Sequence, residues 1–265
     1  MSTFALAVGD GWTLTRRNLR KVTRVPEILF SVLVTPLVFT VLFAYVFGSS
    51  IEVPGGSYRE WLIAGTFALT LTFGATFTGA GIAEDMQKGI IDRFRSLPMS
   101  RAAVVVGRTA SDVLYNALSL VVMSLAGLAV GWRIHTGFGR ALLGFLLLLA
   151  FAHAISWIMA WVGLLVPSPE VVNNAAFMVI FPLTFVANTF APSENLPTPL
   201  RVFAEWNPVS AVTQAARELF GNLPAGLPEP SSWALQHPVL YTTGWIVGII
   251  AVFAPLAVRR YAKVR

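Results

Sequence analysis

The chain has 265 residues, of which 55% are hydrophobic and only 12% are charged. Soluble domains carry about 25% charged residues, and the mean hydropathy of +0.69 is high for a water-soluble protein. The absence of cysteine excludes a disulfide scaffold, a thiolate nucleophile and a Cys-ligated metal. The net charge of +6 fits nucleic acid or a membrane surface, and the placement of the charges favours membrane lipids and no nucleic-acid partner.

Long stretches without charged residues divide the chain, and six of them reach the roughly 20 apolar residues that a bilayer-spanning helix needs. Backbone groups in lipid must be hydrogen-bonded internally, so we expect these spans to be helices. The alternation of apolar and polar residues that is typical of barrel strands is missing from residues 145–150. We therefore predict an all-α membrane protein with six spans, at Ile28–Gly48, Trp61–Ala83, Ala103–Val130, Phe138–Val166, Val171–Phe190 and Val239–Val258.

Lys and Arg residues are unevenly distributed over the connections between these spans. Six spans put both termini on one side of the membrane, and that side receives 14 of the 19 Lys and Arg residues. An excess of basic residues marks the cytoplasmic connections of a membrane protein. The sequence therefore predicts a multi-pass protein of the cell inner (cytoplasmic) membrane with both termini, including the tail 259–265, in the cytoplasm.

The first 27 residues form a basic segment that precedes the first span. Their apolar run is too short for a signal peptide. Between residues 11 and 25, Trp12, Leu19 and Val22 share one helical face, and the basic residues can meet anionic headgroups. We expect residues 1–27 to contain a cytoplasmic interfacial helix, and a plain basic flank is the alternative.

The cytoplasmic connection after the second span predicts a short amphipathic helix over residues 84–98. Glu84 and Asp85 fit the negative charge that a helix N-terminus favours, and Pro98 ends the helix. The helix would either lie on the headgroups or dock on a partner protein, and the residues do not separate these interpretations. The apolar residues that recur on one helical face are Ile90, Ile91, Phe94 and Leu97.

The external connection between the last two spans, residues 191–238, is rich in Pro and Trp. One short helix is expected to end near Asn207 and Pro208. A second helix is expected over Val209–Phe220, with Gly221 and the next residue as its stop. These helices would form a lid over the exit of a pathway or a seal over the bundle.

No nucleotide hydrolysis or metal chemistry is expected from this chain. A P-loop needs a Lys followed by Ser or Thr, and none of the three lysines has one. Asp112 is the one candidate for ion coupling inside a span, but Arg108 one turn earlier predicts an ion pair. His153 shares a stripe with Trp157 and Trp161, which indicates packing more than a ligand contact, and clusters with metal-ligand spacing are missing. We therefore predict a non-catalytic subunit without a cofactor or metal of its own.

Small and hydroxyl residues concentrate in the second span, and amide side chains lie near both ends of the fifth. Small residues let helices approach closely and hydroxyl groups bond across interfaces, so helix packing explains much of this pattern. A weakly polar translocation seam for a large hydrophobic cargo is the functional alternative. The candidate seam residues are Thr66, Thr70, Asn173, Asn174, Phe181, Phe185 and Asn188.

Two stretches resemble the membrane subunits of ABC-2 type exporters, in particular the daunorubicin-resistance permease group of actinobacteria. The resemblance covers nearly the whole chain, although Ile90 and Leu196 stand where the family often has Thr and Met. The first stretch comprises Glu84-Asp85, Gly89 and Leu97-Pro98. The second, which is more specific because many fixed points fall in order, comprises Phe181 to Phe185, Asn188, Phe190, Pro192, Leu196-Pro197, Asn207-Pro208 and Arg217.

The resemblance implies a single transmembrane domain over residues 1–265, with the first five helices in 28–190 and the sixth in 239–258. It implies a cytoplasmic coupling helix at 84–98 and an external re-entrant helical hairpin within 191–238. Two such subunits, identical or homologous, would assemble with two separate ATP-binding subunits that hold ATP and Mg, and would move a hydrophobic drug, antibiotic or lipid outward. The coupling residues would be Glu84, Asp85, Gly89, Ile90, Phe94, Leu97 and Pro98, and the external motif Asn207, Pro208 and Arg217.

Two other functions stay open on the residues alone. A stand-alone secondary carrier of hydrophobic compounds would use an ion gradient and an intramembrane acid such as Asp112. A membrane-embedded enzyme would need a polar group such as His153 for its chemistry. We rank the permease first because its resemblance also supplies a partner for the cytoplasmic segment.

Overall fold

The computed structural model describes residues 34, 37–38, 40–46, 55–91, 101–193, 196–226 and 228–263. Several predictions from the sequence lie outside these residues. They are the interfacial helix within residues 1–27, most of the first span, and the coupling residues Phe94, Leu97 and Pro98.

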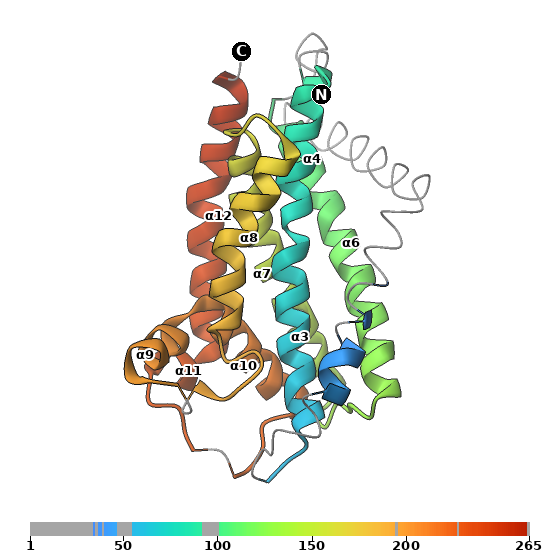
Figure 1. Cartoon of the computed structure of the whole chain (residues 1–265), viewed down its shortest axis with the longest axis vertical. Coiled ribbons are helices and arrows are strands. Elements are labelled where there is room, and N and C mark those ends of the chain that lie inside the picture. Colours follow the sequence, from blue (N-terminus) through green and yellow to red (C-terminus); the bar gives the residue numbers. More distant parts are fainter. Residues whose placement is uncertain are drawn as a thin grey trace.

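The described part of the chain is helical (Figure 1). Its elements in chain order are α3 (Tyr58–Gly74), α4 (Thr76–Gln87), α6 (Arg101–Ala129), α7 (Phe138–Gly163), α8 (Pro169–Phe185), α9 (Thr198–Trp206), α10 (Pro208–Phe220), α11 (Trp233–Gln236) and α12 (Pro238–Lys263).

Four apolar helical segments are long enough to cross a bilayer, at Tyr58–Gln87, Ala103–Ala129, Phe138–Gly163 and Pro238–Lys263. They confirm the second, third, fourth and sixth predicted spans. The first of these segments is built from α3 and α4, which meet at Ala75. The amide of Thr78 binds the Ala75 carbonyl at 3.1 Å, three residues back instead of four, so the helix tightens at this joint.

The fifth predicted span is shorter than expected, because α8 ends at Phe185 and not at Phe190. The side-chain amide of Asn207 donates to the carbonyl of Leu183 at 2.6 Å. The carbonyls in the last turn of a helix lack partners within the helix. Asn207, more than twenty residues later in the chain, therefore supplies a partner that lets α8 stop early.

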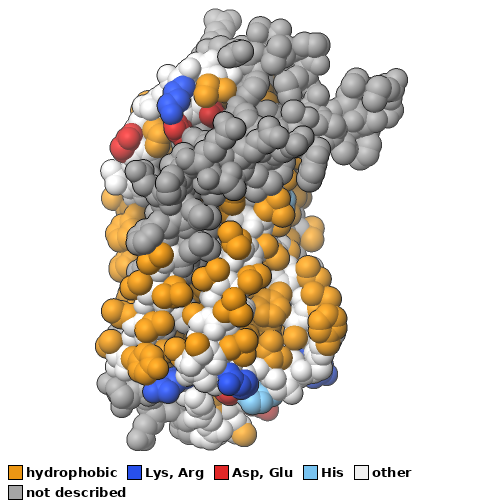
Figure 2. Space-filling model, turned by 90° about the vertical axis from the view of Figure 1, so that its right-hand side faces the viewer, with side chains coloured by type: hydrophobic (Ala, Val, Ile, Leu, Met, Phe, Trp, Pro, Cys, Tyr) orange, Lys and Arg blue, Asp and Glu red, His pale blue; other side chains and the backbone are white. Residues whose placement is uncertain are grey.

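The long helices run side by side, and α9, α10 and α11 gather at the end of the bundle where α3 and α12 begin (Figure 1). The last turn of α4 and the C-terminal end of α12 lie at the opposite end. Hydrophobic side chains cover the middle of the face shown in Figure 2, and charged side chains appear toward its two ends. This distribution matches a helical bundle that crosses a membrane.

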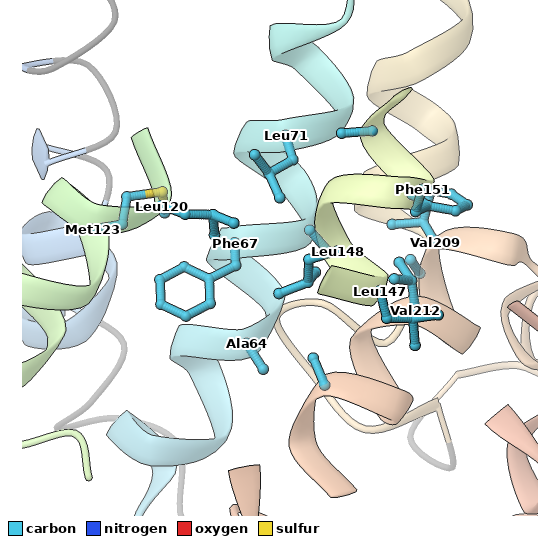
Figure 3. Close-up of a cluster of buried hydrophobic side chains, with 14 of the residues drawn as sticks. Ala64, Phe67, Leu71, Leu120, Met123, Leu147, Leu148, Phe151, Val209 and Val212 are labelled. Atoms are coloured by element: carbon cyan, nitrogen blue, oxygen red, sulfur yellow. The ribbon is translucent and has the colours of Figure 1, made fainter. Parts of the chain in front are cut away.

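The core lies where α3 meets α6, α7 and α10 (Figure 3). Phe67 of α3 is fully buried, and its ring packs edge-on against Trp132 and Phe220, with centroid distances of 5.4 and 6.2 Å. Lipid tails are as apolar as these side chains, so close packing stabilises a bundle in lipid more than removal from water does.

Glycines bring α4 and α7 into backbone contact. A Cβ atom on Gly79 would lie 2.6 Å from the carbonyl oxygen of Met159, and a Cβ atom on Gly163 would collide with the backbone of Gly79. This contact confirms that small residues of the second span serve close helix packing.

We expect Gly79→Ala to destabilise the bundle by about 1–3 kcal/mol, because overpacking displaces backbone that cannot move aside cheaply. Thermal melting of the purified protein in detergent measures the effect. Gly248→Ala in α12 is the matched control, because a Cβ atom there meets no atom within 4 Å, and it should leave the melting temperature unchanged or slightly higher. Equal melting temperatures for the two variants would contradict the packing argument.

Candidate functional site

The cytoplasmic segment begins differently from the prediction. Glu84 and Asp85 lie in the last turn of α4, which continues to Gln87, and not at the start of a separate helix. The prediction that a helix starts at Glu84 was wrong. The preceding helix continues past this residue and ends only before Gly89, which adopts a left-handed conformation with φ of +64°. Glycine is the usual residue just beyond a helix end because it has no Cβ penalty there.

The charged groups beside this turn differ in exposure, with Lys88 exposed and Glu84 partly exposed. The ammonium of Lys88 donates to the carboxylate of Glu84 at 2.5 Å, one turn apart on the helix. This hydrogen bond, helped by the negative charge, raises the pKa of Lys88, so Lys88 stays protonated. Asp85 is buried, with 8% of its surface exposed. The end of α4 therefore presents a fixed charge pair followed by a glycine turn.

Of the residues between the glycine turn and α6, the structure describes Ile90 and Ile91, which are helical. Ile91 is 3% exposed and belongs to a buried cluster with Ile82, Val105 and Tyr261. Ile90 is partly exposed. Of the apolar face predicted for 90–97, Ile91 thus packs against α4, α6 and α12 and is not available to a partner.

An aromatic ladder follows the surface of α8. Phe177, Phe181 and Phe185 recur every four residues, and their rings stack with centroid distances of 4.9 and 4.4 Å. Phe190 continues the ladder at 5.2 Å from Phe185, and Phe43 stacks on Phe190 at 4.5 Å. The three α8 rings are 38–56% exposed. The prediction named Phe181 and Phe185 but missed Phe177, which the spacing of four residues would have found.

The predicted seam residues do not form one surface. Thr66 is fully buried, and its hydroxyl donates to the carbonyl of Ile63 in its own helix at 2.8 Å. Asn188 is 4% exposed, and Thr70 is half-buried. The exposed members all lie on α8: they are Asn173, Asn174, Phe181 and Phe185. The candidate seam residues therefore lie on two different surfaces, because Thr66 of α3 faces inward while α8 carries its aromatic face outward.

Arg217 of α10 is fully buried at the end of the bundle where α3 and α12 begin. Its Nε donates to the carbonyl of Trp61 at 2.9 Å, and Nη2 donates to the carbonyls of Asn188 and Thr189 at 2.8 and 3.3 Å. The guanidinium carbon lies 3.5 Å from the centroid of the Trp61 ring. Arg217 thereby ties α10 to α3 and to the segment after α8, a set of contacts that its place in the predicted external motif did not reveal.

The start of α10 is fixed by Asn207 and Pro208, the other two residues of the external motif. Asn207 is the N-cap, and its Oδ1 accepts from the amide of Val209 at 2.8 Å. Pro208 occupies the first turn, where its missing N–H costs no hydrogen bond. Gly221 ends the helix at φ of +75°, as its position predicted. Both expected external helices are present, as α9 and α10.

A small pocket of about 110 Å³ opens beside Arg217 and is lined by Trp61, Asn188, Gln214 and Leu235, among others. Drug-sized ligands occupy pockets of about 300–1,000 Å³. This pocket is therefore too small to hold a drug-sized cargo.

His153 of α7 accepts a hydrogen bond from Trp157 at 3.1 Å, which fits the packing interpretation of the stripe that these residues form with Trp161.

Residues 10–220 match the ABC-2 type transporter family. The chain belongs to this family. It is 30% identical over 257 residues to the daunorubicin resistance ABC transporter permease protein DrrB1 of Streptomyces coeruleorubidus, covering 97% of this chain and 87% of the relative. It is 24% identical over 246 residues to the probable doxorubicin resistance ABC transporter permease protein DrrC of Mycobacterium tuberculosis, covering 92% and 85%. It is 22% identical over 213 residues to the putative transport permease ycf38 of Porphyra purpurea, covering 79% and 73%.

These relationships confirm the resemblance seen in the sequence. This ABC-2 permease is a multi-pass membrane subunit of an ABC exporter. The relatives are transport permeases, so the chain is a membrane component that works with an ABC ATPase and a permease partner. ATP is used by the ATPase partner.

Proposed function

We propose that this permease moves a hydrophobic drug, antibiotic or lipid outward, as one of two permeases driven by two separate ATP-binding subunits. The aromatic ladder on α8 carries the proposal, because exposed stacked rings offer planar surfaces for an aromatic cargo. Relatives named for resistance to daunorubicin and doxorubicin support a cargo of this class.

We place the ladder at the boundary between the two permeases, whether the second is identical or homologous. The pocket beside Arg217, at about 110 Å³, is too small for a drug-sized cargo, and the exposed ladder offers a larger aromatic surface. The ladder occupies the second half of α8, from Phe177 to Phe185, and offers successive stacking positions along the helix. Closing a second permease against this face would exclude lipid from the path.

We propose that the end of the bundle with the last turn of α4 and the C-terminus of α12 faces the cytoplasm, with both termini there. The basic residues of residues 88–108 and of the C-terminal tail support this orientation. The segment from Glu84 to Pro98 would then meet the ATP-binding subunit, which holds ATP and Mg. The helices α9 and α10 would form the external re-entrant hairpin and face outward.

The test is ATP-driven accumulation of daunorubicin in inside-out membrane vesicles that contain the permease, with and without its ATP-binding subunit. We expect accumulation only when both subunits and ATP are present. An ATP-binding subunit with an inactive Walker lysine is the control, and it should give no accumulation. Accumulation driven by a pH gradient without the ATP-binding subunit would instead establish a secondary carrier.

In the same vesicles, Phe181→Ala should reduce the rate of daunorubicin accumulation about threefold to tenfold, because it removes the central ring of the α8 stack. Phe138→Ala is the matched control, because Phe138 is 83% exposed and lies outside the ladder. Both variants should insert in the membrane in equal amounts. Equal transport rates for the two variants would count against the ladder as the path.

A further inference from the structure

Three polar residues form a stripe on α6 inside the apolar part of the bundle. Arg108, Asp112 and Asn116 are spaced by four residues and so share one helical face. Asp112 and Asn116 are 1% and 5% exposed, and the Arg108 side chain is 14% exposed. Ionisable side chains within a membrane helix are expensive and mark functional positions, so the stripe calls for an explanation.

The side chains of this stripe form hydrogen bonds with residues of α4. The hydroxyl of Thr78 donates to Oδ2 of Asp112. Arg108 donates through Nη2 to the carbonyl of Phe77 at 2.7 Å, and its Nε lies 3.8 Å from Oδ2 of Asp112. The predicted ion pair is therefore present, and the same two residues also reach across to the neighbouring helix.

Glycines on the facing helix make room for the stripe. A Cβ atom on Gly81 would collide with the guanidinium of Arg108, and one on Gly74 would lie 2.6 Å from Oδ1 of Asn116. Gly74, Thr78 and Gly81 therefore lie opposite Asn116, Asp112 and Arg108, respectively. We refer to the six residues as the polar zipper: Gly74, Thr78, Gly81, Arg108, Asp112 and Asn116.

The polar zipper adds polar contacts to the apolar packing of α6 against α7, α12 and α3. Only 33% of the apolar span of α6 is buried, against 72% for Tyr58–Gln87. Many of its large side chains point away from the bundle, as Leu114, Val121 and Leu125 do with exposures of 44–63%. The zipper therefore gives this partly buried helix fixed polar partners on its neighbour.

The zipper also joins the two helices that flank the cytoplasmic segment. The chain leaves α4 at Gln87 and enters α6 at Arg101, so residues 88–100 connect them. A force applied to this segment pulls on both helices. If they were not joined, it would separate them instead of moving the bundle.

We propose that the polar zipper holds α4 and α6 as one unit, so that movement of the cytoplasmic segment displaces both helices together. Arg108, Asp112 and Thr78 are then positioning residues for transport. This inference rests on the proposed function, because it assumes that an ATP-binding subunit acts on the segment.

The first test separates transport from ATP hydrolysis in vesicles that contain the permease and its ATP-binding subunit. Thr78→Val should lower the daunorubicin transported per ATP hydrolysed about tenfold, because the bond to a charged group is lost, and Thr78→Ser should restore it. Thr72→Val is the matched control, because the Thr72 hydroxyl bonds only within its own helix, to Ala68 at 2.7 Å. An unchanged ratio in Thr78→Val would overturn the proposal.

The second test measures whether α4 and α6 keep a fixed distance from each other. The chain has no cysteine, so spin labels can be placed on Gln87→Cys at the end of α4 and Val106→Cys on α6, both exposed positions. In the assembled complex, we expect the same distance distribution with and without ATP, and a broader one after Thr78→Val. A distance that changes with nucleotide in the otherwise unsubstituted zipper would refute the inference, whereas loss of all ATP-driven transport would refute the proposed function instead.

Discussion

Replacement of Arg217 by Met is expected to lower the stability of the folded permease by about 3 kcal/mol or more. The guanidinium binds three backbone carbonyls in a buried site, and each acceptor left unsatisfied costs about 1–3 kcal/mol. Arg217→Lys should recover only part of the loss, because an ammonium lacks the planar fork and the stacking surface that meet Trp61. Thermal melting in detergent and the yield of monodisperse protein measure the effect.

Arg140→Met is the matched control for this change. Arg140 lies in the first turn of α7 and is exposed, and surface substitutions usually change stability by less than about 0.5 kcal/mol. Both variants remove one positive charge. Melting temperatures that fall equally in the two variants would show that charge, and not the buried contacts, is responsible.

Replacement of Gly89 by Val is expected to reduce ATP-driven transport about tenfold while the bundle stays folded. The left-handed backbone at Gly89 costs a residue with a side chain about 1–2 kcal/mol, which corresponds to roughly a tenfold change in the population of the turn. Among the residues that the structure describes, none lies within 4 Å of an added Cβ atom, so the expected effect comes from the backbone conformation. Gly89→Asn should retain more transport, because Asn tolerates this conformation better.

Gly131→Val controls for backbone strain as such. Gly131 also has a positive φ, of +101°, and open space around it, but it follows α6 at the other end of the bundle. We expect similar losses of thermal stability in both variants and a transport defect in Gly89→Val alone. Vesicle accumulation of daunorubicin, normalised to the amount of assembled complex, distinguishes them, and equal transport would exclude a special role of the Gly89 turn.

The spans could be predicted because lipid tolerates few charges, so the gaps between charged residues mark them directly. The external helices could also be predicted, since Pro208 and Gly221 signal a start and a stop locally. The early end of α8 could not, because its cause is the bond from Asn207 to Leu183, a contact between residues far apart in the chain.

In the candidate site, too, features with a local cause could be predicted from the sequence, and features that depend on distant contacts could not. Gly89 could be recognised in the sequence as a residue that permits a turn. The length of α4 before it also depends on packing with neighbours such as Ile91, which the sequence does not reveal. The burial of Arg217 left no trace in its local sequence, because the carbonyls that bind it come from α3 and from the segment after α8. Phe177, in contrast, could have been predicted, because it lies four residues before Phe181 on the same helical face.

The joint at Ala75 divides one membrane-crossing segment into two arms with different attachments. Arg217 fastens the outer arm to α10 by way of Trp61, and Thr78 fastens the inner arm to α6. Under the proposed function, a movement that begins at the α4 end of the bundle passes through this tightened turn before it reaches the end where α10 lies. A bend at Ala75 would reduce the movement that arrives there, so the stiffness of this single turn would set how much is transmitted.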